Sequence, residues 1–212
     1  MIRFQTMLRQ IDCGIKPSWE AEPSLEGLFK TIKEVLFSPS DFFRLMPKGG
    51  GIGLPLLFGV INNTLGVFLV SFWGLLLGIK IGLPEPSASW TVLYAILLPV
   101  ISVVDVFFSS SILHLCLLIV GGGKAGFEAT FRVVSYSRAS YLWAVLPVLG
   151  PFMSSVYMVI LYIIGLKEAH AIGNGKAILA VFLPILILAA AFLFIMITLV
   201  SLPQKPVDSL AL

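Results

Sequence analysis

Long apolar runs separated by short polar or glycine-rich stretches fill the chain from about residue 54 to residue 199. A membrane-spanning helix needs about 20 mainly apolar residues, so each run of that length is a candidate span. The pattern predicts five spans, at about 54–79, 91–120, 130–147, 151–166 and 177–199. We therefore expect an all-α, polytopic membrane protein. Its five-helix bundle would occupy residues 49–202, after an N-terminal segment at 1–48 and before a polar tail at 203–212.

The third and fourth spans come from one run of about 40 residues, 125–166, which is too long for a single span. Pro147 and Pro151 flank Gly150 near its middle. Each proline removes a backbone donor and clashes with the preceding turn, which disfavours one continuous helix. The run therefore predicts a helical hairpin, with a helix carrying polar residues, a tight turn and an apolar helix.

An amphipathic pattern marks the N-terminal segment. Apolar residues recur there at helical spacing: Leu25, Leu28, Phe29, Ile32, Val35 and Leu36. Ser24 is a suitable N-cap for this helix. Because the helix is short and its polar face carries charges of both signs, we expect it either to lie on the membrane surface or to dock on the bundle. The alternative is an ordinary helix in a small soluble tail.

Aromatic residues near the predicted membrane boundaries indicate interfacial anchors. Ser38 and Pro39 open a second short amphipathic helix, and its aromatic residues stand beside a basic one. Aromatic and basic residues concentrate where a span meets the headgroups. The predicted anchor residues are Phe42, Phe43, Arg44 and, at the start of the second span, Trp90.

Composition agrees with a membrane protein. Of the 212 residues, 58% are hydrophobic and 12% charged, whereas soluble domains are about 45–50% apolar and about 25% charged. The lipid bilayer is therefore the first expected partner. A net charge of +3 is too small to argue for nucleic acid. Cys13 and Cys116 lie far apart in dissimilar surroundings, which predicts neither a disulfide nor a metal site.

The distribution of basic residues predicts the topology. Lysine and arginine in short loops mark the cytoplasmic side. Five spans with a cytoplasmic N-terminus leave Lys80 and Lys205 outside, whereas four spans would also move Lys167 and Lys176 outside. The five-span arrangement fits better and places the C-terminus on the non-cytoplasmic side.

A few polar and charged residues inside the apolar runs form a candidate buried seam. An ionised side chain at the bilayer centre costs at least about 2.5 kcal/mol, so it faces the bundle interior and finds a partner. We predict that Asp105 pairs with Arg138 or Arg132 across the second and third spans. The residues expected to complete the hydrogen bonds are Tyr136, Ser135 and Asn62. The seam would either fix the helix register or bind a ligand or lipid headgroup; a third alternative is that these charged residues do not pair at all.

Catalysis is not indicated. Asp105 and His114 are nine residues apart, which places them on opposite faces of a straight helix. The glycine runs at 49–51 and 121–123 lack the context of a phosphate-binding loop. We expect no catalytic residue, no metal site and no cofactor.

Several motifs resemble those of a known family. They are the segment SPSDFF at 38–43, FRVVSYSRASYLW at 131–143, and LPVLGPFMSSVYMVILYIIGLKEAHAIGNGKAILAVFLP at 146–184. Over about residues 36–199 the chain resembles the Yip family of membrane proteins, which carry the Ypt/Rab-interacting-protein domain, in its bacterial form. The resemblance implies a five-span helical bundle with a cytoplasmic N-terminus. It also implies location in a bacterial inner membrane, where members have no assigned reaction, whereas eukaryotic relatives are tied to Rab GTPases and to vesicle traffic between ER and Golgi.

Two functions fit these expectations. The first is a non-enzymatic scaffold or adaptor that meets a protein partner or organises the membrane through its N-terminal segment. The alternative is a transporter or binding protein for a small molecule or lipid that uses the Asp105–arginine seam. Association of the chain with copies of itself is compatible with both.

Overall fold

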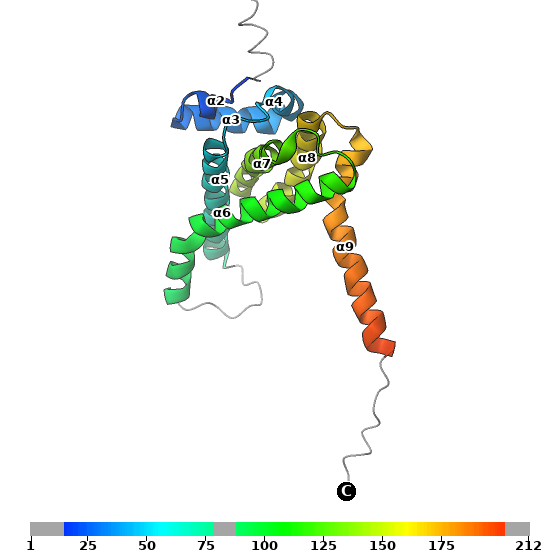
Figure 1. Ribbon diagram of the computed structural model, residues 1–212. Helices are drawn as coiled ribbons and strands as arrows, with labels where there is room; N and C mark the ends of the chain where they lie inside the picture. The colour runs from blue at the N-terminus through cyan, green and yellow to red at the C-terminus, as the bar shows by residue number, and fades with distance from the viewer. Residues whose placement is uncertain (1–14, 79–87, 202–212) are drawn as a thin grey trace, which may run out of the picture.

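The computed structural model describes residues 15–78 and 88–201, of which 88–91 and 199–201 are described by their backbone alone, and these residues form helices without any strand. The elements are α2 (Ser18–Ala21), α3 (Leu25–Phe37), α4 (Pro39–Leu45), α5 (Gly53–Leu77), α6 (Ala88–Ile119), α7 (Gly126–Ser137), the 3-10 helix η1 (Arg138–Val145), α8 (Gly150–His170) and α9 (Asn174–Ser201). The predicted all-α class is confirmed. Figure 1 shows α2, α3 and α4 lying across one end of a bundle formed by the remaining helices.

Four helices in the described part of the chain are long and apolar enough to cross a membrane. They are Gly53–Leu77, Val92–Ile119, Gly150–His170 and Asn174–Thr198. These agree with four of the five predicted spans, and the large apolar side chains on their outer faces are exposed. In a bilayer, lipid chains cover such faces at no cost, because the hydrocarbon is as apolar as leucine.

The predicted third span has a different form. Instead of one α-helix over 130–147, the chain forms the 12-residue α7, followed directly by the eight-residue η1. The hydroxyl groups of the serines at 135, 137 and 140 are buried without a hydrogen-bond partner among the described residues, so competition of these hydroxyls for backbone bonds does not explain the break. An α-helix rises about 1.5 Å per residue and a 3-10 helix about 2.0 Å, so the two segments extend about 18 Å and about 16 Å.

The turn between η1 and α8 lies where the prolines predicted it. The amide of Leu146 donates to the carbonyl of Trp143 at 3.0 Å, and the amide of Gly150 donates to that of Leu146 at 2.9 Å. A side chain at position 150 would bring its Cβ to 2.6 Å from the Trp143 carbonyl oxygen. Only glycine therefore allows α8 to start so close to η1.

The N-terminal cap, as we call α2, α3 and α4 together, is docked on the bundle. As predicted, the Ser24 side chain caps α3, accepting a hydrogen bond from the Gly27 amide at 3.1 Å. Leu28, Ile32 and Val35 are buried. Two residues of the predicted apolar face are not: Leu25 is 75% exposed and Phe29 61% exposed.

Close helix packing in the bundle depends on small residues. A Cβ on Gly66 of α5 would lie 2.6 Å from Cβ of Tyr141, and one on Gly165 of α8 would lie 2.5 Å from a methyl carbon of Val133. In a bilayer there is no hydrophobic driving force between helices, so their association depends on close packing. Glycines at these positions let the helix backbones approach closely enough for that packing. By contrast, α9 packs only through its first turns, and its later part stands apart from the bundle (Figure 1).

Candidate functional site

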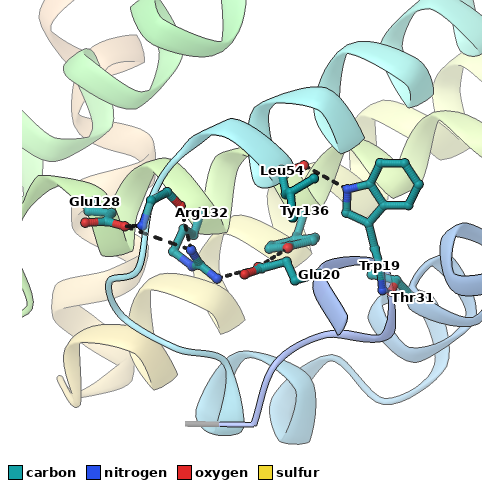
Figure 2. A network of polar contacts seen from close by, with 8 residues as sticks. Trp19, Glu20, Thr31, Leu54, Glu128, Arg132 and Tyr136 are labelled. Atoms are coloured by element: carbon teal, nitrogen blue, oxygen red, sulfur yellow. Dashed lines mark hydrogen bonds and ion pairs between the residues drawn. The ribbon is translucent and has the colours of Figure 1, made fainter. Parts of the chain in front are cut away.

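The first polar cluster is centred on Arg132 of α7, whose side chain is fully buried. Its guanidinium donates to the Glu20 carboxylate and, through the other terminal nitrogen at 2.8 Å, to the carbonyl of Gly51. A second carboxylate, Glu128, lies one turn away on α7 at 3.9 Å from Arg132. Figure 2 shows these groups converging at the junction of the cap with α5 and α7.

Gly51 is fixed between the two charged partners. Its amide donates to the Glu128 carboxylate at 2.6 Å, and its carbonyl accepts from Arg132. The backbone here has φ +104° at Gly51 and +114° at Gly50, a region that residues with a Cβ rarely adopt. The glycine run before α5 therefore delivers backbone groups to the cluster.

Tyr136, one turn beyond Arg132, completes the cluster. Its hydroxyl donates to the same oxygen of Glu20 that Arg132 contacts. The tyrosine ring is buried between those of Phe42 and Phe58, with centroid distances of 5.1 and 5.0 Å. A single carboxylate from the cap thus accepts two hydrogen bonds from the bundle.

Like Glu20, Trp19 joins α2 to the rest of the protein through hydrogen bonds. Its indole nitrogen donates to the carbonyl of Leu54 at 2.8 Å, and its backbone amide donates to the hydroxyl of Thr31 at 2.9 Å (Figure 2). The four-residue helix α2 is therefore attached to α3 on one side and to α5 on the other. Glu20, the next residue, is held facing Arg132.

The second polar cluster is centred on Arg138, the first residue of η1. One terminal nitrogen lies 2.7 Å from the Asp105 carboxylate of α6 and 3.1 Å from the Ser109 hydroxyl, and the other donates to the Tyr141 hydroxyl at 2.9 Å. Ser109 also donates to Asp105 at 3.3 Å. The Arg138 side chain is 4% exposed, whereas that of Asp105 is 39% exposed. The pair is thus closed toward the bundle and open on its outer side.

The predicted seam is therefore divided. Asp105 meets Arg138, one of its two predicted partners, while Arg132 meets Glu20. Ser135 is fully buried with no hydrogen-bond partner for its hydroxyl among the described residues. Asn62 donates to the carbonyl of Phe58 on its own helix at 2.8 Å, so neither residue completes the Asp105 pair.

The predicted interfacial anchors lie elsewhere than expected. Phe42 and Phe43 are buried in the core, so they do not present their rings to a bilayer. The prediction was wrong for them because α4 packs against the bundle instead of standing beside it. Arg44 is exposed and pairs with Asp41 on the same helix. Trp90 lies in the first turn of α6, whose side chains are outside the described part of the structure.

Glu20 belongs to the first polar cluster but was not predicted from the sequence. It stands in a polar tail, on a four-residue helix with no periodic pattern, 112 residues before Arg132. The sequence feature that could have pointed to Glu20 is its position next to Trp19, between Pro17 and Pro23. A tryptophan in an otherwise polar stretch indicates a residue that becomes buried, and Glu20 would be buried along with it.

Each cluster joins one arginine to carboxylates and hydroxyl groups. The first contains two carboxylates, Glu20 and Glu128, beside Arg132, and the second contains Asp105 beside Arg138. Within the described residues, no three His, Cys, Asp or Glu side chains gather closely enough to hold a metal ion. Removing one partner of a buried ion pair costs about 3–5 kcal/mol, since the other charge is left uncompensated. The geometry is suited to fixing helices against each other.

Comparison with known proteins identifies the family. No curated protein and no solved structure matches this chain. The family model of the Yip1 domain matches residues 33–196, which is well over half of the sequence. The match includes α4 to α8, most of α9 and both arginines, but Glu20 lies before it. The chain therefore belongs to the Yip1-domain family of membrane proteins.

Proposed function

We propose that this protein is a non-enzymatic membrane organiser that presents its N-terminal cap at the cytoplasmic surface of a bacterial inner membrane. The observation that supports this most directly is the cap itself. Glu20 and Trp19 attach it to the bundle, while Leu25 and Phe29 remain exposed on α3.

The exposed edge of α3 has the chemistry of a membrane contact. Leu25 and Phe29 are four residues apart and so lie on one side of the helix, next to the buried face. Lys30 and Lys33 are exposed on the same helix. Burying a leucine or phenylalanine side chain is worth about 1.5–3 kcal/mol, and each lysine near an anionic surface adds about 1 kcal/mol. The cap would thus insert the Leu25 and Phe29 side chains between lipid headgroups beside the bundle.

Vesicle remodelling tests this proposal. Protein reconstituted into anionic liposomes should change vesicle size or shape, and the double substitution Leu25→Ser with Phe29→Ser should abolish the change. Phe37→Ser is the matched control: Phe37 is 69% exposed on the same helix, but eight residues from Phe29 and thus about 80° around it. Unaltered remodelling by the double variant, with all proteins equally folded, would refute the proposal.

A scaffold requires that a partner also uses the cap. Native mass spectrometry of the extracted protein would show whether a protein companion binds in a fixed ratio. If the companion is present with the wild type and lost in the same double variant, the exposed edge of α3 binds a protein partner as well as the bilayer. If the companion persists in the variant, the exposed edge of α3 is not its docking surface.

The orientation is tested separately. A cytoplasmic N-terminus follows from the positive-inside distribution of lysine and arginine. If α7 with η1 crosses the membrane as well as the four long helices, a reporter fused after Leu212 should report the non-cytoplasmic side. A cytoplasmic signal would remove α7 and η1 from the set of spans.

The second candidate is binding of a lipid or small polar molecule at Asp105 and Arg138. The specific observation in its favour is the outward opening of the pair, because a 39% exposed carboxylate in a membrane helix needs a polar neighbour. A lipid or small molecule retained by the extracted wild-type protein and lost in Arg138→Ala would favour this role. An equal complement of bound molecules in both proteins would refute it.

A further inference from the structure

The chain has two histidines, and both lie in one hydrogen-bonded chain outside the two arginine clusters. His114 of α6 and His170, the last residue of α8, contact the same hydroxyl, that of Thr130 on α7. The distances from Thr130 Oγ1 are 2.9 Å to Nδ1 of His114 and 3.0 Å to Nε2 of His170. Both His170 and Thr130 are buried, so this hydroxyl joins three helices in the interior.

The backbone determines the protonation state of His170. Its Nδ1 lies 3.1 Å from the amide nitrogen of Ala125, which can only donate, so Nδ1 must be an acceptor without a proton. The proton of a neutral ring is then on Nε2, which donates to Thr130. An imidazolium would carry protons on both nitrogens and would direct one of them at the Ala125 N–H. The observed geometry therefore requires neutral His170.

The segment held by His170 is the connection between α6 and α7. It comprises residues 120–125. The angle φ is +66° at Gly121, and the amide of Ala125 donates to His170. Lys176 of α9 holds the other end, donating to the Gly121 carbonyl at 3.3 Å. The loop is thus held at one end by the imidazole of His170 and at the other by the ammonium group of Lys176.

Charged and titratable groups from several elements surround His170. Lys48, between α4 and α5, acts on it electrostatically, as does His114 from α6. On its own helix, Lys167 and Glu168 are paired with each other at 3.4 Å. On α7, the described contacts of Glu128 are with Gly51 and Arg132. No carboxylate among the described residues hydrogen-bonds either imidazole.

We propose that His170, Thr130 and His114 form an acid-sensitive latch that holds the α6–α7 connection closed while His170 is neutral and releases it when the ring is protonated. Release removes the acceptor of Ala125 and separates the end of α8 from the start of α7. The latch lies near the N-terminal end of α7, and the same helix contacts the cap through Arg132 and Tyr136. The inference concerns regulation and stands whether or not the cap deforms membranes.

Hydrogen exchange tests the latch. Wild-type protein in nanodiscs is compared at about pH 8 and about pH 5, which brackets ordinary histidine titration, with rates corrected for intrinsic pH dependence. Loss of one hydrogen bond worth about 1–1.5 kcal/mol corresponds to roughly tenfold faster exchange. Peptides covering residues 121–126 should show at least that acceleration at the lower pH, while peptides within α5 should not.

Two variants separate protonation from other causes. His170→Gln keeps one acceptor and one donor but does not titrate, so its loop should exchange equally at both pH values. Lys176→Gln weakens the other end of the loop, so it should raise exchange at both pH values and keep the wild-type acceleration. Equal wild-type protection at both pH values, or an acceleration that persists in His170→Gln, would overturn the proposal.

A direct observation of the ring covers the case in which His170→Gln fails to fold. Nitrogen NMR of wild-type protein with labelled histidine should show one ring in the neutral Nε2–H form at about pH 8. His114→Gln assigns that signal, because only two histidines exist. A charged His170 at pH 8, or a ring that becomes charged while residue 125 stays protected, would refute the latch.

Discussion

Replacing Glu20 by alanine tests how the cap is attached. The change removes the acceptor of both Arg132 and Tyr136 and leaves the fully buried guanidinium with the Gly51 carbonyl and with Glu128 at 3.9 Å. Truncating one partner of a buried ion pair costs about 3–5 kcal/mol. The chain can limit this cost by undocking the cap, which lets water reach Arg132. We therefore expect local opening of the cap before global unfolding.

The magnitude sets the assay. A cost of about 3–5 kcal/mol corresponds to a roughly 10²- to 10⁴-fold larger population of the open cap, because each 1.4 kcal/mol is a factor of ten. Hydrogen exchange in peptides spanning α2 and α3 should accelerate by that factor, up to the point at which the cap is fully open. Peptides from α5 and α8 should change far less.

Two controls make the result specific. Glu22→Ala removes an exposed acid two residues away and should leave cap exchange unchanged. Glu20→Gln keeps an acceptor without the charge and should fall between wild type and Glu20→Ala. If Glu20→Ala leaves cap protection at the wild-type level, or if α5 and α8 open along with the cap, the assignment of Glu20 as the cap's attachment is refuted.

Two further substitutions test the bundle. Gly66→Ala would place Cβ 2.6 Å from Tyr141 Cβ and should cost about 1–3 kcal/mol by overpacking, seen as a lower thermal midpoint in detergent; Gly74→Ala, with nothing within 4 Å, is the control and should be silent. Asp105→Ala leaves Arg138 without its counter-ion and should lower the free energy of unfolding by about 1–3 kcal/mol, and with it the midpoint, since a 39% exposed partner is worth less than a buried one. A midpoint equal to that of the wild type would show that the pair does not stabilise the bundle.

Features that depend on nearby residues were predictable from the sequence. Local patterns predict the N-cap residue of α3, Ser24, as well as the four long spans and the turn beside Gly150. The pairing of Asp105 with an arginine was also predictable, because few charges lie within the apolar runs. The choice between Arg138 and Arg132 was not, since it depends on Glu20 occupying Arg132 from 112 residues away.

Two other features depend on tertiary packing. In a chain so rich in apolar residues, composition does not distinguish a ring that faces lipid from one that faces protein, and Phe42 and Phe43 proved to be core residues. Likewise, hydropathy reports that residues 130–147 suit a nonpolar environment but not how the backbone winds there. Contacts of η1 with α5 and α8 accompany its 3-10 form.

The pairing of Glu20 with Arg132 has a consequence for biosynthesis. Chains are made from the N-terminus at about 5–20 residues per second, so Glu20 leaves the ribosome about 6–22 s before Arg132. An arginine in an apolar helix costs about 2.5–3.5 kcal/mol to insert alone. Here the acid that compensates it has already been made, as Asp105 has been for Arg138. Each arginine thus arrives after its counter-ion, and the order of synthesis matches the order in which the bundle can close.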